Sequence, residues 1–382
     1  MTPRSFLTLT LITVVFAAGA IWMVLSRDTG TGVRGEGRVL FPGLVEKVND
    51  VRRVKVTRGS GTSTLVATEK DGQVSWKIEE LYGYPVPLAS VRAVAGGLAQ
   101  VAVIEAKTTR PAKYPKIQVE DPKGKESKSA RVELFGKSGE KLADLIVGME
   151  KPTLSGPGQL YVRSPVEERA WLARGRVAVP EKREGWVDRM IVEVDLPRVR
   201  ETTLVQEGEK PLRVYKKAER DQDFIVERMP EGYELKELFG AEDISRSIQN
   251  LAFEEVKPAA EIGIDVAKAP HVRHITFDGL IIEGWSKRIG KKLWFTFRAR
   301  ANPAPLPGEK VEADKIAKEV AKINRVSTGW AYTLNEFETK NMLKTLEGMI
   351  QPKLGAEKKS SEKAPGNKAP AEETPGQPGD SR

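Results

Sequence analysis

The chain has 382 residues, of which 40% are hydrophobic and 30% are charged, and its formal net charge is +9. It contains no cysteine, which excludes disulfides, thiolate metal sites and cysteine nucleophiles, and its two histidines leave little material for histidine catalysis. The 53 acidic residues nearly balance the 62 basic ones, so the surface is densely mixed in charge, which argues against a nucleic-acid partner.

An uncharged run, FLTLTLITVVFAAGAIWMVL at residues 6–25, follows a short N-terminus. About twenty helical residues span a bilayer core of about 30 Å, so this run predicts a transmembrane anchor. A cleaved signal peptide is the alternative, since Ala18 to Ala20 fit a small-residue cleavage pattern, but cleavage there would leave an apolar new terminus. We expect a single-pass protein of the bacterial inner membrane, with the bulk of the chain outside the cytoplasm.

The first strands are predicted directly after this region. RVKVTR at 53–58 alternates Val54 and Val56 with polar residues, as a half-buried strand does. STLVATEKDGQVSWKIEE then predicts two further strands around an Asp-Gly turn. These three segments indicate an antiparallel meander.

A helix-like segment, VRAVAGGLAQVAVIEA at 91–106, has an echo in ISRSIQNLAFEEVKPA at 244–259. The apolar face of the first helix repeats every three or four residues after Ser90, its predicted N-cap, and comprises Val91, Val94, Ala95 and Leu98. The second helix is expected from about Ala241, with an apolar face made by Ile244, Ile248 and Leu251. Three strand-like segments precede it as well: RETTLVQE, PLRVYKKAE and DFIVERM. The repeated order predicts an internal duplication.

Hairpins are expected in the remainder of each half. The first half contains ARVELFGKSGEKLADLIVGME and QLYVRSPVEERAWLAR, and the second contains RHITFDGLIIEGWSKRIGKKLWFTFRARA and GWAYTLNEF. The second half adds a short helix in VEADKIAKEVAKINRVS and a last helix in NMLKTLEGMI. Beyond Gln351 the chain is rich in Lys, Glu, Pro, Ala, Gly and Ser, a composition typical of disorder.

The predicted fold class is therefore α+β: an N-terminal transmembrane helix followed by two tandem repeats of an antiparallel β-meander plus an amphipathic helix. The expected parts are a cytoplasmic N-terminus (1–5), the anchor (6–25), a flexible linker (26–40), lobe 1 (41–182), lobe 2 (183–351) and a disordered tail (352–382).

Motifs that could carry chemistry are weak. GKSGEK at 136–141 lacks the preceding glycine of a phosphate-binding loop, because Arg131 stands at that position, and a hairpin turn is the better interpretation. His271 and His274 lie three positions apart, but their flanks indicate entry into a strand and no third metal-ligand type clusters beside them. We therefore predict no catalytic, cofactor-binding or metal-binding residue and no cofactor.

Charged and aromatic clusters favour structural interpretations. Four adjacent acidic pairs are expected to be solvated, because a general acid–base pair needs two carboxylates facing one pocket: Glu79–Glu80, Glu120–Asp121, Glu167–Glu168 and Glu254–Glu255. The basic clusters at 286–292 and 122–131 are typical of solubilising loops, with contact to lipid or an acidic partner as the alternative. Four tryptophans are expected in sheet packing: Trp76, Trp171, Trp294 and Trp330.

Several segments resemble a known family. LFPGLVEKVNDVRRVKV, YPVPLASVRAVAGGLAQVAVIEAKTTRPAKYPKIQVEDP, LADLIVGM, YVR and AWLARG are similar to the membrane-anchored bacterial proteins grouped as domain of unknown function 4340. The resemblance covers about residues 39–180 and returns more weakly up to about residue 352. It implies one N-terminal span and an extracytoplasmic repeat domain, associated with the auxiliary protein and permease of an ABC-type export system. No functional residue carries over from it.

Two function classes follow as expectations. The first is a non-enzymatic, membrane-tethered accessory or scaffold protein of an ABC-type transporter, meaning its permease and ATPase, or of another envelope complex. The second is a module that binds or senses an envelope glycan or lipid in the cleft between the repeats, with the small-molecule ligand unknown. A carboxylate-dependent hydrolase is a third, weaker alternative, because no acid pair is nominated for it.

Overall fold

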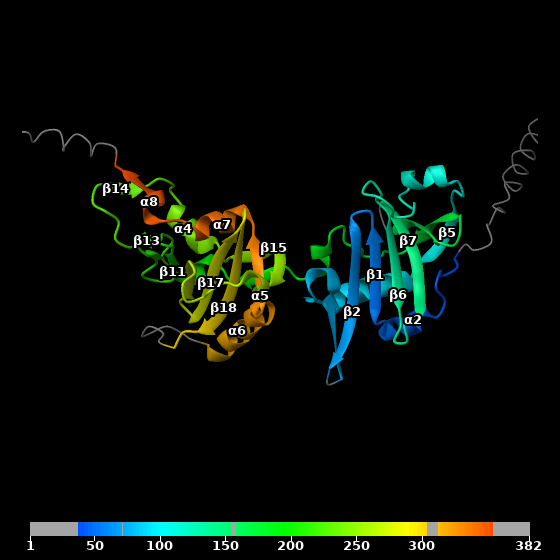
Figure 1. Ribbon diagram of the computed structural model, residues 1–382, viewed down its shortest axis with the longest axis horizontal. Coiled ribbons are helices and arrows are strands. Elements are labelled where there is room, and N and C mark those ends of the chain that lie inside the picture. Colours follow the sequence, from blue (N-terminus) through cyan, green and yellow to red (C-terminus); the bar gives the residue numbers. More distant parts are fainter. Residues whose placement is uncertain (1–36, 71, 154–157, 304–311, 354–382) are drawn as a thin grey trace, which may run out of the picture. The chain divides into compact units, whose positions relative to one another are not determined.

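The computed structural model describes residues 37–70, 72–153, 158–303 and 312–353. The chain divides into two compact units, of which unit 1 ends at Asp188 and unit 2 begins at Arg189. Each unit is built on one nine-stranded sheet, and the paired strands are antiparallel throughout (Figure 1).

Unit 1 has the sheet order β4-β3-β2-β1-β6-β7-β8-β9-β5. Its strands are β1 (Arg53–Arg58), β2 (Gly61–Lys70), β3 (Gln73–Ile78), β4 (Tyr84–Val86), β5 (Ala102–Ala106), β6 (Ala130–Phe135), β7 (Lys141–Lys151), β8 (Gln159–Arg163) and β9 (Ala170–Arg174). Its helices are α2 (Leu44–Lys47), α3 (Leu88–Ala99) and the 3-10 segments η1 (Val48–Asp50), η2 (Glu79–Leu81), η3 (Pro111–Lys116) and η4 (Arg183–Trp186).

The core of unit 1 follows from alternation and from one helix. Val54 and Val56 of β1 are buried, as the alternating pattern predicts, and the predicted apolar face of α3 is buried completely. The predicted N-cap is wrong: Pro87 caps α3, and Ser90 lies inside it. Pro87 stands at the N-cap position with an extended backbone and a φ fixed by its ring, so the helix begins earlier than the Ser90 signal indicates.

A second, smaller core lies under the connection between β5 and β6. Tyr114 and Val119 from this connection pack with Ile146 of β7 and Ala170 of β9. The Tyr114 hydroxyl donates a hydrogen bond to the Glu168 carbonyl. The connection that carries η3 is therefore held against the sheet.

Unit 2 has the sheet order β10-β15-β19-β18-β17-β16-β11-β12-β13, beside a separate two-stranded sheet of β14 and β20. Its strands are β10 (Met190–Glu193), β11 (Val199–Val205), β12 (Leu212–Tyr215), β13 (Ile225–Val226), β14 (Tyr233–Leu235), β15 (Asn250–Pro258), β16 (His271–Thr276), β17 (Leu280–Ile289), β18 (Lys292–Ala301), β19 (Trp330–Leu334) and β20 (Ile350–Pro352). Its helices are η5 (Leu196–Arg198), α4 (Gly240–Arg246), α5 (Ala259–Ile262), α6 (Ala313–Ser327), α7 (Glu336–Met342) and α8 (Leu346–Met349).

Helices cover the unit 2 sheet at separate places. The inserted helix is confirmed as α6, which packs on β18, where the Asn324 side chain bonds both the amide and the carbonyl of Ala299 at 2.8 Å. The helix expected from Ala241 is shorter than predicted, since α4 ends at Arg246 and Leu251 lies in β15. The last predicted helix is wrong as one element, because the chain forms α7, α8 and β20 in its place.

The two sheets share one connectivity. Unit 1 contains the run β3-β2-β1-β6-β7-β8-β9-β5, and unit 2 contains β13-β12-β11-β16-β17-β18-β19-β15, so each strand finds its counterpart in the same place. Strand β10 lies beside β15, and in unit 1 a bridge from Val39 to Ala102 holds the corresponding edge of β5. The repeat therefore lies in the connectivity of two large sheets.

The expected α+β class is wrong. The chain is mostly β. The later hairpins of each half do not form a separate layer, because they join the sheet of the first meander through pairing of β1 with β6 and of β11 with β16. Such pairing joins segments far apart in sequence, and local periodicity does not report it.

None of the helices among the described residues combines the length and hydrophobicity needed to cross a bilayer. The predicted anchor at 6–25, the N-terminus before it, the linker up to residue 36 and the tail from residue 354 lie outside the described residues.

Candidate functional site

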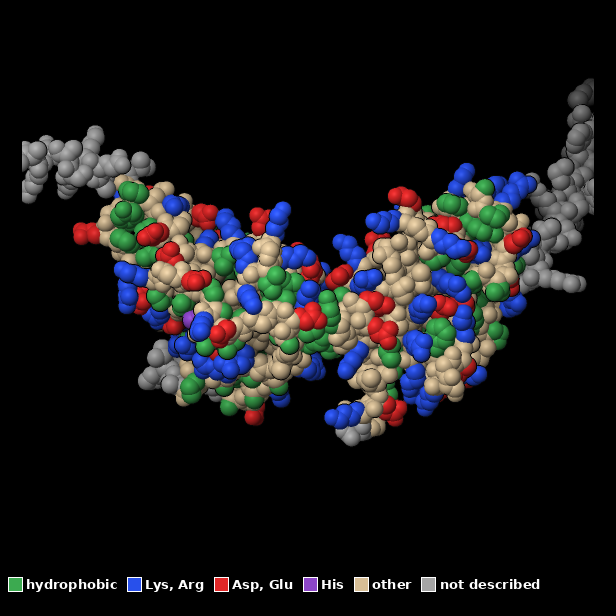
Figure 2. All heavy atoms as spheres, viewed as in Figure 1, with side chains coloured by type: hydrophobic (Ala, Val, Ile, Leu, Met, Phe, Trp, Pro, Cys, Tyr) green, Lys and Arg blue, Asp and Glu red, His purple; other side chains and the backbone are tan. Residues whose placement is uncertain are grey.

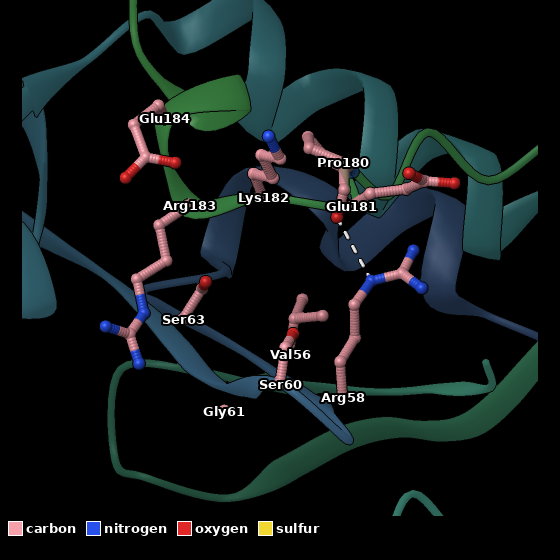
Figure 3. A pocket seen from close by; sticks show the side chains of 10 residues that line it. All are labelled: Val56, Arg58, Ser60, Gly61, Ser63, Pro180, Glu181, Lys182, Arg183 and Glu184. Atoms are coloured by element: carbon pink, nitrogen blue, oxygen red, sulfur yellow. Dashed lines mark hydrogen bonds between the residues drawn. The ribbon is translucent and has the colours of Figure 1, made fainter. Parts of the chain in front are cut away.

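A polar pocket of about 240 Å³ lies in unit 1 where the β1–β2 turn meets the segment 180–184 (Figure 3). Arg58, Ser60 and Ser63 line it from the hairpin, and Arg183 lines it from the segment. Figure 3 shows the side chains of Arg58 and Arg183 on either side of the two serines.

Arg58 and Arg183 bond across this pocket between the β1–β2 hairpin and the segment 179–183, and we call these contacts the clasp. The contacts of Arg58 form one side of it. Its guanidinium donates to the carbonyls of Val179 at 2.9 Å, Pro180 at 3.1 Å and Lys128 at 3.4 Å. Burial lowers the pKa of Arg58 from its ordinary value. Because these donors are used on backbone carbonyls, the side chain holds the segment 179–180 and Lys128 against the β1–β2 hairpin.

The other side of the clasp depends on a glycine. Arg183 donates to the Thr62 carbonyl at 3.1 Å, and a Cβ on Gly61, whose φ is +134°, would lie 2.7 Å from the Arg183 guanidinium. The residues that line this pocket include no histidine and no thiol, so Ser60 and Ser63 have no activating base of that kind beside them.

A fully buried polar array lies in unit 2 around His274. Its Nδ1 is 2.9 Å from the Thr202 hydroxyl, which is 3.0 Å from the Ser245 hydroxyl, and its Nε2 has no hydrogen-bond partner among the described residues. Burial lowers the pKa of His274 to about 3. The imidazole is therefore neutral and closed off from any external substrate.

The two histidines do not form a metal site. Both lie on β16, as the predicted strand entry requires, and residues three apart on a strand point to opposite faces of the sheet. Within the described ranges, no group of three or more metal-ligating side chains comes together.

The acidic pairs have separate structural roles. Glu80 accepts from the Thr64 amide at 2.7 Å, and Glu120 accepts from the Ser127 hydroxyl at 2.9 Å. Asp121 pairs with Arg163 at 2.5 Å. In Glu167–Glu168, the carbonyl of each residue accepts a bond from a buried side chain of the β5–β6 connection or β8.

The structure brings the Glu254–Glu255 pair to the basic cluster of the β17–β18 hairpin. Lys292 of that cluster bonds Glu255 at 2.7 Å, and both acids line a pocket of about 290 Å³ with Arg288 and Lys291. The opposite charges offset one another there.

GKSGEK is confirmed as the turn between β6 and β7, closed by a bond from the Gly136 amide to the Glu140 carbonyl at 2.9 Å.

Sequence reasoning missed a basic pocket in unit 1. It has a volume of about 520 Å³, and its lining comprises Ala106, Lys107, Thr108, Thr109, Arg110, Lys113, Lys116, Ile117 and Tyr161. The signal was present, because the four cations recur every third residue in KTTRPAKYPK. Side chains at i and i+3 eclipse one another on a 3-10 helix, so η3 aligns Lys113 and Lys116, and Arg110 directly precedes the helix.

An exposed apolar pair in unit 2 was also missed. Leu238 is 84% exposed and Phe239 is 61% exposed, just before α4. Figure 2 shows hydrophobic side chains gathered on the surface over β14 and α8, the neighbouring elements. The chain on both sides of the pair is held: the Lys236 amide bonds the Met349 carbonyl at 2.8 Å, Glu237 pairs with Lys344 at 3.1 Å, and the Phe239 carbonyl accepts from the Asp243 amide at 2.9 Å.

Comparison with known proteins gives one match. The family described as "Domain of unknown function (DUF4340)" matches residues 76–268, which is just over half of the 382-residue chain. Neither the curated proteins nor the solved structures contain a match. The matched region runs from β3 of unit 1 to the residues before β16 of unit 2, so it includes parts of both sheets. The chain belongs to the DUF4340 family.

Proposed function

We propose that this protein is a non-enzymatic accessory or scaffold protein, attached to the bacterial inner membrane through residues 6–25 and holding its two β units outside the cytoplasm. The partner in this proposal is an ABC-type transporter, meaning a permease with its ATPase. The uncharged run at 6–25 supports the attachment. The partner is the one that the resemblance to the family implies.

The exposed apolar pair, Leu238 and Phe239, is the observation that carries the scaffold function. Exposing two large adjacent hydrophobic side chains to water costs free energy, and exposed apolar patches typically mark protein–protein contacts. Because the preceding residues are already held, Lys236 by Met349 of α8 and Glu237 by Lys344, little conformational entropy is lost when a partner covers the pair. Aromatic side chains such as Phe239 are enriched at the core of protein–protein interfaces.

The experiment is crosslinking in living cells followed by purification of the full-length protein from native membranes. The wild type is expected to recover a permease and its ATPase. Leu238→Ser/Phe239→Ser should lose them. The matched control is Val166→Ser/Val266→Ser, which removes two other exposed side chains, at 91% and 55% exposure, and should retain them.

Recovery of the protein alone, at an abundance where a known membrane complex survives the procedure, would contradict the scaffold function. Equal loss of the partner in both double variants would show that the apolar pair is not the contact. Both variants should keep the unfolding midpoint of the wild type, because the substituted side chains are exposed.

A further inference from the structure

The basic pocket of unit 1 has an unbalanced charge. Lys107 pairs with Glu105 at 2.7 Å, whereas Arg110, Lys113 and Lys116 have no carboxylate within ion-pair distance among the described residues. No acidic residue lines the pocket. Like charges that line the same pocket repel one another. Three unpaired cationic side chains around this pocket therefore favour an anionic ligand.

The pocket is held in shape by the core beneath it. Tyr114 of η3 is 6% exposed, and the guanidinium of Arg163 lies 4.7 Å from the centre of its ring. Pro111 and Pro115 restrict the backbone on either side of Lys113. The cations are therefore mounted on a fixed turn, and a ligand need not order the backbone that presents them.

The pocket lies at the end of unit 1 where the described chain enters. The Gly37 amide bonds the Val103 carbonyl at 2.7 Å, and the Leu40 amide bonds the Val101 carbonyl at 2.9 Å. This antiparallel register means that the entering chain comes from the Ala106 end of β5, where the pocket begins. Figure 1 shows the start of the described chain close to β5.

The distance from the expected membrane attachment is short. Residues 26–36 separate the uncharged run from Gly37. Such a stretch spans at most about 40 Å when fully extended. The chain-entry end of unit 1 therefore lies within about 40 Å of the membrane surface if residues 6–25 are embedded in it, as the proposed function requires.

We infer that the basic pocket binds the phosphate of anionic membrane lipid headgroups, of the phosphatidylglycerol type, and so holds unit 1 against the bilayer. This inference rests on the proposed function for its choice of a membrane over free phosphate. Arg110, Lys113 and Lys116 supply the charge, and Thr108 and Thr109 add polar groups to the lining of the same pocket.

The test uses the full-length protein in detergent. The chain has no cysteine, so Ala112→Cys places a single environment-sensitive fluorophore beside the pocket at an exposed residue that does not line it. The probes are short-chain phosphatidylglycerol, short-chain phosphatidylcholine and inorganic phosphate. We expect saturable binding of phosphatidylglycerol and at least tenfold weaker binding of the other two.

The pocket variant is Arg110→Gln/Lys113→Gln/Lys116→Gln. Each basic side chain near an anionic surface strengthens binding about fivefold, so this variant should bind phosphatidylglycerol about a hundredfold more weakly. The control is Lys47→Gln/Lys70→Gln/Lys137→Gln, which makes the same change in net charge. These three exposed lysines lie near the Arg53 end of β1 and the Phe135 end of β6, at the opposite end of the sheet from the basic pocket. It should bind within about twofold of the wild type.

Equal binding of the two lipids, inorganic phosphate binding as tightly as phosphatidylglycerol, or equal weakening by both triple variants would overturn the inference. The urea midpoint of each variant, read by tryptophan fluorescence, separates lost binding from lost folding. Headgroup binding in detergent needs neither the attachment at 6–25 nor a transporter. It can therefore fail while the transporter is still recovered, and it can succeed while recovery fails.

Discussion

Acidification should destabilise unit 2 through His274. An ordinary histidine has a pKa of 6.5, and burial lowers the pKa of His274 to about 3 in the folded protein. Between these values the unfolded chain binds a proton that the folded unit does not, so stability is fully present above the unfolded pKa and falls as the pH drops below it. Each pH unit costs about 1.36 kcal/mol, which gives a loss of about 2 kcal/mol from this group between pH 7.5 and pH 5.

The perturbation that isolates this effect is His274→Gln. Glutamine cannot ionise in this range, and it keeps a polar group beside the Thr202 hydroxyl. The free energy of unfolding should fall by about 2 kcal/mol more in the wild type than in the variant between pH 7.5 and pH 5. Carboxylates that titrate elsewhere affect both proteins alike and cancel in the difference.

The assay is urea unfolding at several pH values. At each urea concentration, pulsed hydrogen exchange and mass spectrometry measure the folded fraction from peptides of β11, β16 and α4. These peptides report unit 2 without interference from unit 1. An identical pH dependence in the two proteins would refute the reasoning, because it would mean that His274 is protonated in the folded unit or reached by solvent.

Three further predictions concern stability, each read as the free energy of unfolding from urea titration. Asn324→Ala should cost about 1–3 kcal/mol in unit 2, since both bonds to Ala299 are lost, and a cost below about 0.5 kcal/mol would show that water replaces them. Gly61→Ala should cost about 1–3 kcal/mol in unit 1, because φ of +134° and the contact with Arg183 both resist a Cβ; an unchanged midpoint would contradict the clasp. Leu98→Ala should cost about 2–5 kcal/mol, because this side chain on α3 is fully buried, and a surface-like effect would contradict its place in the core.

Local structure was predictable where neighbouring residues determine it. The β2 and β3 strands follow from the Asp-Gly sequence between them, and the apolar face of α3 follows from a period of three to four residues. Leu251 was assigned to a helix because its spacing from Ile244 fits one, yet it lies in β15, where pairing with Val192 determines its conformation. Tertiary contacts outweigh helix propensity at such a boundary.

The sheets themselves could not be predicted from local patterns. Strand β1 pairs with β6 across the whole of β2 to β5, and no periodicity in either segment identifies the other as its partner. For the same reason, local patterns could not predict the ion pair between Lys292 and Glu255. The basic pocket differs, because its three-residue spacing around Lys113 was visible and only the 3-10 geometry of η3 was not recognised.

The most direct test of the scaffold function is site-specific photo-crosslinking in living cells, with the photoreactive amino acid placed at Phe239 or, as a control, at Val166. Both positions are exposed, at 61% and 91%, so both should react with a neighbour if one is present. We predict an adduct with a permease or ATPase subunit from position 239 and none from position 166. No adduct from position 239, or the same adducts from both positions, would contradict it.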